Sequence, residues 1–108
     1  MINIDEFNAR LGNNSAIVGK ILKVFSDQYG QKSDLLREPV DSGDTEQVYF
    51  LAHSIKGALA NICAEDDANI AAQIESVAKA GTMPEEALIV EMETRMQKIY
   101  AQIDDYLS

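Results

Sequence analysis

The chain has 108 residues, of which 46% are hydrophobic and 25% are charged, a size and composition typical of one folded domain rather than a disordered segment. Eighteen acidic residues against nine basic ones give a formal net charge of −9, which opposes binding to nucleic acids and to anionic membrane surfaces. No apolar run approaches the roughly 20 residues needed to cross a bilayer, so insertion into a membrane is not expected.

Glycines and prolines divide the first part of the chain into two helical segments. Residues 4–12 (IDEFNARLG) predict a short amphipathic lead-in helix that ends at its final glycine. Residues 13–39 carry apolar side chains at helical intervals, which predicts one long helix. Asn14 or Ser15 is expected to cap its start, and Pro39 to end it, because the residue before a proline disfavours the helical conformation.

The next helix follows a loop at residues 40–44 (VDSGD). Asp44 and Gln47 have the spacing of a capping box, in which two side chains satisfy the free N–H groups at a helix start. We therefore expect a helix from about Thr45 to about Ala64. This helix contains the only histidine of the chain.

Two more helices complete the expected fold. Residues 67–81 form the third, which ends at a glycine, and residues 84–107 form the fourth, with a proline and two glutamates in its first turn. The inward stripe of the fourth helix is expected to be Leu88, Met92, Met96, Ile99, Ile103 and Tyr106. No strand pattern is present. The sequence predicts an all-α protein, one domain over residues 1–108, folded as an antiparallel up-down four-helix bundle with a short N-terminal lead-in helix.

The single histidine, His53, is expected on the outer surface of the bundle. A helix turns by about 100° per residue, so the position of each side chain around the axis follows from its number. The apolar side chains of this helix lie roughly opposite His53: Val48, Leu51, Ile55, Ala58, Leu59 and Ile62. Its neighbours within about 60° include Tyr49, Phe50, Lys56, Gly57 and Ala60.

Gly57 and Lys56 distinguish this histidine from an ordinary exposed one. A glycine inside a helix costs roughly 1 kcal/mol relative to alanine, and Gly57 lies one turn from the imidazole. Two explanations stay open: close approach of another molecule, or a close helix crossing inside the bundle. Lys56, three residues after His53, is near enough to neutralise an anion on the ring, although alone it reads as a solvated surface residue.

With AHSIKGALANICA in this four-helix pattern, the chain resembles a histidine-containing phosphotransfer (HPt) domain of two-component phosphorelays. The resemblance covers nearly the whole chain and centres on His-x-x-Lys-Gly, preceded by alanine and followed by small residues. It implies that His53 accepts a phosphoryl group from a receiver-domain aspartyl phosphate and passes it to another receiver. Lys56 would neutralise phosphoryl oxygens and Gly57 would leave room. Glu75 matches a position where the family often carries Glu or Gln, and could orient the ring.

The resemblance also implies the partners. These are response-regulator receiver domains, a hybrid sensor histidine kinase, or both. From their position around His53, we expect Tyr49, Phe50 and Ala60 to contact the receiver, with part of the NNSAIVG stretch (residues 13–19) completing the patch. The alternative for Tyr49 and Phe50 is packing against the lead-in helix. No glycine-rich phosphate loop is present, so we expect a phosphate carrier with no cofactor of its own. The partner would supply the aspartate, the magnesium ion and most of the electrostatic stabilisation.

Two positions depart from the family pattern. Where the family commonly has glycine, ten residues after the histidine, this sequence has Cys63, which predicts a helix end with less freedom to turn or a longer site helix. Where leucine often follows, it has Asp67, a charge that is tolerable if it caps the next helix. Cys63 itself is expected to be a small packing residue.

Other function classes are weaker. Di-iron bundles use paired Glu-x-x-His motifs, whereas here Phe50 stands three places before one histidine. A hydrolase would need a second catalytic group, for which Glu75 is the only candidate. A non-catalytic helical adaptor that binds receivers without carrying phosphate stays as the alternative. The acidic N-terminus and the lone cysteine, which cannot form an internal disulfide, favour a cytoplasmic protein, most simply a monomer.

Overall fold

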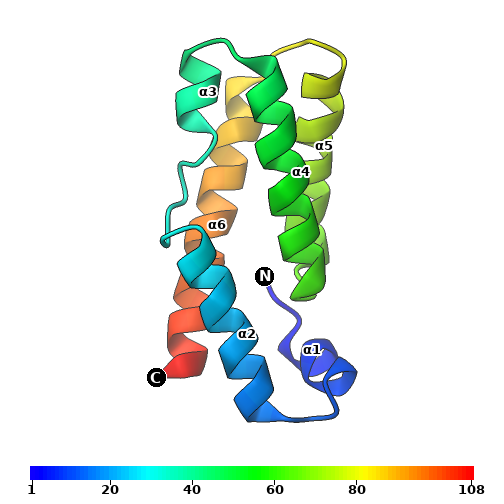
Figure 1. Cartoon of the computed structure of the whole chain (residues 1–108), viewed down its shortest axis with the longest axis vertical. Helices are drawn as coiled ribbons and strands as arrows, with labels where there is room; N and C mark the ends of the chain where they lie inside the picture. Colours follow the sequence, from blue (N-terminus) through cyan, green and yellow to red (C-terminus); the bar gives the residue numbers. More distant parts are fainter.

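In the computed structural model, which describes residues 1–108, every regular element is a helix, and the prediction of an all-α bundle is confirmed. The helices are α1 (Ile4–Arg10), α2 (Ser15–Gln28), α3 (Arg37–Asp41), α4 (Thr45–Asn61), α5 (Glu65–Lys79) and α6 (Glu86–Leu107). The four long helices α2, α4, α5 and α6 form an elongated bundle, with α1 beside one end and α3 near the start of α4 (Figure 1). None of the helices has the length and apolar character that crossing a membrane requires.

The prediction of one helix over residues 13–39 is wrong. Asn14 caps the start as expected, its side chain accepting a hydrogen bond from the Ile17 N–H, but α2 ends at Gln28. Gly30 and the following glutamine both adopt a φ of +58°, which turns the chain out of the helix. Pro39 then lies inside the first turn of α3 instead of ending a helix, because first-turn residues need no N–H for helical hydrogen bonding.

One cluster of 24 buried side chains fills the bundle. The predicted inner face of α4 is confirmed at Val48, Ile55 and Leu59, which are each at most 1% exposed, whereas Leu51 and Ala58 are only partly buried. The predicted stripe of α6 is wrong at its ends. Leu88 and Tyr106 are only partly buried, whereas Ile89 and Tyr100 lie in the core. The cause is that the buried stripe of a helix is wider than one row of side chains, and a single-row reading misses the adjacent positions.

The turn between α4 and α5 is made by Cys63 itself. The side chain is buried, as expected of a packing residue, and the backbone has a φ of +59°. The N–H of Ala64 donates to the Leu59 carbonyl and that of Cys63 to the Ala60 carbonyl, which is the Schellman pattern that usually ends on glycine. α4 therefore ends at Asn61, and the expectation of a longer or less sharply turned helix end is wrong.

Asp67 does not cap α5, the role that would have made a charge tolerable at this position. Its side chain is 2% exposed and reaches between elements, accepting a hydrogen bond from Arg95 of α6 at 3.0 Å and pairing with the terminal ammonium group of Met1. Next to this ion pair, Ile2 exchanges two backbone hydrogen bonds with the side chain of Gln102. Asp67, the charged residue that departs from the family pattern, therefore links the N-terminal segment and α6 to the start of α5.

Candidate functional site

His53 lies in the middle of α4 with 61% of its side chain exposed. The capping contact that begins this helix is the predicted one, in which the Asp44 carboxylate accepts the Gln47 N–H at 3.0 Å. Because Ala52 and Ile55 face the core and are almost fully buried, the helix is held in the rotation that turns His53 to solvent. The predicted position on the outer surface is confirmed.

Glu75 of α5 joins the imidazole to the neighbouring lysine. Its carboxylate contacts Nδ1 of His53 through one oxygen and accepts a hydrogen bond from Nζ of Lys56 at 2.7 Å through the other. The Glu75 side chain is 15% exposed, so it is not an ordinary solvated carboxylate. Since a carboxylate only accepts hydrogen bonds, Nδ1 carries the hydrogen, and Nε2 is the nitrogen with a free lone pair.

These two contacts also control the charge of Glu75. Burial opposes ionisation, but the hydrogen bonds from Lys56 and His53 outweigh it and lower the pKa of Glu75 below its ordinary value of 4.5. The site therefore keeps a negative charge behind the ring at neutral and mildly acidic pH. Lys56 is directed toward this carboxylate, and its side chain stays 34% exposed.

The lowered pKa predicts a pH dependence of stability. A carboxyl group whose pKa is lower in the folded state stabilises the fold above its unfolded-state pKa, and this contribution is lost as pH falls through the folded-state value. We expect the contribution of Glu75 to be complete above its unfolded-state pKa of about 4.5 and to be lost progressively as the pH falls from there through the lower folded-state pKa. Urea unfolding followed from neutral pH to about pH 3 should show a shallower acid dependence for Glu75→Gln than for the wild type. Identical curves for the two proteins would contradict this.

Gly57 has open space around it. A Cβ atom built at this position would meet nothing within 4 Å, whereas one at Gly19 in α2 would contact Leu107 at 3.4 Å. Of the two explanations left open by the sequence, a close helix crossing inside the bundle is therefore excluded. What the glycine preserves is a clearing on the outer surface, one turn from the imidazole.

Two aromatic rings continue the surface from His53 toward the start of α4. The ring centroids of Tyr49 and His53 are 6.1 Å apart, and those of Tyr49 and Phe50 are 5.3 Å apart. Phe50 is 54% exposed, while Tyr49 and Ala60 are partly buried against the core. Packing against α1 is excluded for the two aromatic residues, because α1 lies at the opposite end of α4 (Figure 1).

On the other flank of the site lies the end of α2, not its start at residues 13–19 as predicted from the sequence. The hydroxyl groups of Tyr29 and Ser54 lie 3.1 Å apart, which places the end of α2 beside the residue following His53. Ile17 and Val24 of α2 are exposed and lie on the side of that helix away from Gly19, where α6 packs. Only the helical position of Ser54 could have indicated this flank, because Tyr29 fell within the helix that was predicted to continue to Pro39.

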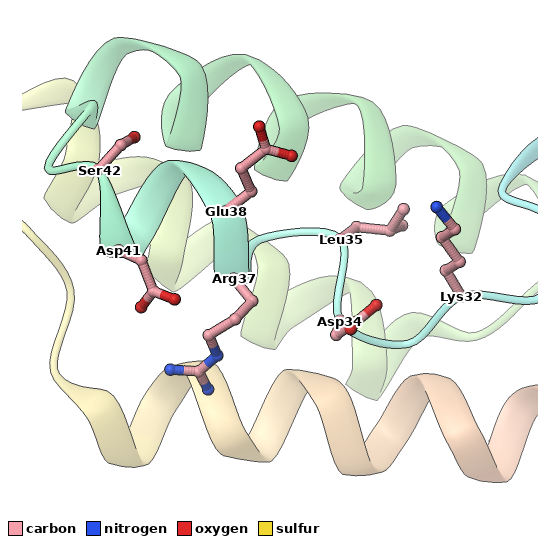
Figure 2. Close-up of a pocket in the computed structure, with 7 residues that line it drawn as sticks. All are labelled: Lys32, Asp34, Leu35, Arg37, Glu38, Asp41 and Ser42. Atoms are coloured by element: carbon pink, nitrogen blue, oxygen red, sulfur yellow. The ribbon is translucent and has the colours of Figure 1, made fainter.

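A large hollow on the surface lies away from the histidine. It has a volume of about 720 Å³ and lies along the connection from Lys32 to Ser42. Figure 2 shows that its side chains do not converge: Arg37 is directed toward α6, away from Glu38. Arg37 donates to Glu86 at 2.7 Å and to Glu93 at 2.8 Å, and these hydrogen bonds raise its pKa above the ordinary value. Arg37 therefore links α3 to α6 and is not a free cation in this hollow.

Comparison with protein families identifies the family of the chain. The model of the Hpt domain family matches residues 20–107, most of the chain. The chain belongs to the Hpt domain family. Hpt domains act in phosphotransfer of two-component signalling, and they interact with receiver domains and kinases. The match to the Hpt domain begins within α2, so α1 and its contacts lie outside it. No significant match is found among curated proteins or solved structures.

Proposed function

We propose that this Hpt domain carries a phosphoryl group on His53, taking it from the aspartyl phosphate of one receiver domain and giving it to the aspartate of another. The observation that carries the proposal is the exposed imidazole whose Nδ1 is bonded to Glu75. This arrangement fixes the ring and leaves Nε2 facing outward as the nucleophile. A histidine that served only packing would not need a carboxylate behind it and open space beside it.

The transfer step follows from these positions. The Nε2 lone pair attacks phosphorus, the P–N bond forms, and the P–O bond to the donor aspartate breaks, so that the electron pair leaves with the aspartate carboxylate. The hydrogen on Nδ1 stays in place, and the ring gains positive charge next to the Glu75 carboxylate. Lys56 lies one turn along α4 from His53 and would neutralise charge on the phosphoryl oxygens. Return of the group to a second aspartate is the same step in reverse.

The rest of the chemistry comes from the partner. We assign to the receiver the aspartate, the magnesium ion and the exclusion of water, and to this chain no cofactor of its own. Tyr49, Phe50 and Ala60 would contact the receiver on one side of His53, with the end of α2 near Tyr29 on the other. We also propose a cytoplasmic monomer, whose donor is a receiver or a hybrid sensor kinase.

A labelling experiment tests the proposal. The domain is incubated with receiver domains encoded in the same genome, each loaded with radioactive phosphate, and then separated from them. The expected result is a label on this chain that acid removes and base does not, as for a phosphoramidate bond on histidine. Absence of label with every receiver and every hybrid kinase of that genome would refute the phosphocarrier function.

Gly57→Ala should separate stability from transfer. The added methyl group meets no atom of the chain and removes a helix-interior glycine, so the free energy of unfolding should rise by about 1 kcal/mol. The same methyl group occupies the clearing beside His53, so transfer from a receiver should slow by about tenfold, equivalent to ~1.4 kcal/mol. Urea unfolding and the labelling rate measure the two effects.

Gly19→Ala is the matched control for this prediction. It also replaces a glycine inside a helix, and its new Cβ makes an ordinary contact with Leu107, away from His53. It should leave the labelling rate unchanged. If Gly57→Ala labels as fast as Gly19→Ala, the clearing has no role in transfer.

A further inference from the structure

A second feature lies on the aromatic side of His53. A hollow of about 360 Å³ separates the start of α4 from the end of α5, and Thr45, Tyr49 and Phe50 line it from α4. Lys79 lines it from α5. The volume is ample for one large apolar side chain, and two of the walls are aromatic rings in contact with each other.

The hollow lies within reach of any protein that reacts with His53. A stable interface covers about 800 Å² of each partner, which corresponds to a disc with a radius of roughly 16 Å. Thr45 is eight residues before His53, about 12 Å along a helix that rises 1.5 Å per residue. Tyr49 bridges the distance, since its ring stacks near the imidazole. A receiver centred on Nε2 therefore covers the hollow as well.

The charges at the rim point to one kind of contact. Lys79 forms no ion pair in this acidic chain, in contrast to Lys56, which is bonded to Glu75. Glu46 also lies on the rim without pairing to Lys79, so both groups are available to a partner. A free ammonium group near the edge of the footprint can pair with a carboxylate of the partner.

We propose that this hollow receives one apolar side chain of the receiver, that Lys79 pairs with a receiver carboxylate next to it, and that the two contacts select which receivers this chain serves. The inference rests on the proposed phosphocarrier function and names a specificity-determining contact of the same site. In this proposal Phe50 and Tyr49 form the walls of the hollow. This role explains why the Phe50 side chain stays 54% exposed.

Two variants and two controls test it. Lys79→Glu reverses the rim charge, and Thr45→Phe fills the hollow. Lys98→Glu and Thr94→Phe make the same changes on exposed positions of α6, which lie outside the hollow. Each protein is checked for folding by urea unfolding. Each is then labelled both by phosphoramidate, a small donor that needs no docking, and by the phosphorylated receivers described above.

If the proposal holds, KM for the best receiver rises by about tenfold in Lys79→Glu and in Thr45→Phe, and the order of preference among receivers changes. Labelling by phosphoramidate stays within about twofold of the wild type, and the α6 controls behave as wild type with both donors. Wild-type KM values and preferences in both hollow variants would overturn this inference and leave the phosphocarrier function standing. Failure of the wild type to accept phosphate from any receiver or kinase would instead remove the function and this inference with it.

Discussion

His53→Gln is expected to take no phosphoryl group from any receiver, whereas the wild type becomes labelled. Glutamine has no nitrogen lone pair that can attack phosphorus, because the amide nitrogen is conjugated with its carbonyl group. The side chain is 61% exposed, but its hydrogen bond to Glu75 is weakened, so the substitution should change the free energy of unfolding by about 1 kcal/mol. The labelling assay measures the loss, and urea unfolding shows that the fold is kept.

The same variant separates a carrier from an adaptor. A phosphate carrier that loses its nucleophile should still bind the receiver, because the surface around position 53 is otherwise intact. We therefore expect binding of His53→Gln to the receiver, measured by titration calorimetry, to stay within about threefold of wild type, while signalling through the relay stops. Normal signalling by His53→Gln would refute the carrier function and favour the adaptor.

Asp67→Ala should give the largest loss of stability in the chain outside the apolar core. The substitution removes a carboxylate that is 2% exposed and accepts a charged hydrogen bond from Arg95 at 3.0 Å. The Met1 ammonium group loses the same partner. Hydrogen bonds to charged groups contribute about 1.5–3 kcal/mol, and the freed cations regain some hydration because they are partly exposed. We expect a loss of about 2–3 kcal/mol in urea unfolding.

Asp66→Ala is the control for this experiment. Asp66 is the neighbouring acidic residue in the first turn of α5, but it is exposed and forms no ion pair. Its replacement should change stability by no more than about 0.5 kcal/mol. If the two variants unfold at the same urea concentration, the buried ion pair contributes nothing beyond the general effect of an acidic residue at the helix start.

Helical periodicity was enough to predict the bundle and the outward position of His53, because both depend on which face of a helix is apolar. It failed to predict where a helix ends, because the backbone conformation that ends the helix does not depend on side-chain polarity. The end of α2 is set by two consecutive residues with positive φ, Gly30 and Gln31, and a glutamine gives no sign of that conformation. Cys63 is a similar case, because it turns the chain where glycine was expected to be needed.

The partners of charged residues could not be predicted either. Glu75 could be named from a family position, but its simultaneous contact with His53 and Lys56 depends on how α5 is rotated against α4. Asp67 meets Arg95 and Met1 across 28 and 66 residues of sequence. Such pairs depend on how the helices are aligned and rotated against one another in the fold. A single sequence gives only the spacing of residues within each helix. The hollow between Phe50 and Lys79 also depends on how α4 and α5 are aligned.

The sharp turn after α4 also provides a native reporter group. The only thiol of the chain is 1% exposed at the joint between the helix that carries His53 and the helix that carries Glu75, and burial raises its pKa. A thiol-specific reagent can reach it only when this joint opens, so the rate of modification measures the opening equilibrium directly. If binding of a receiver clamps the two helices together, the thiol should become slower to modify, and the dynamics of the unmodified protein become visible without any added probe.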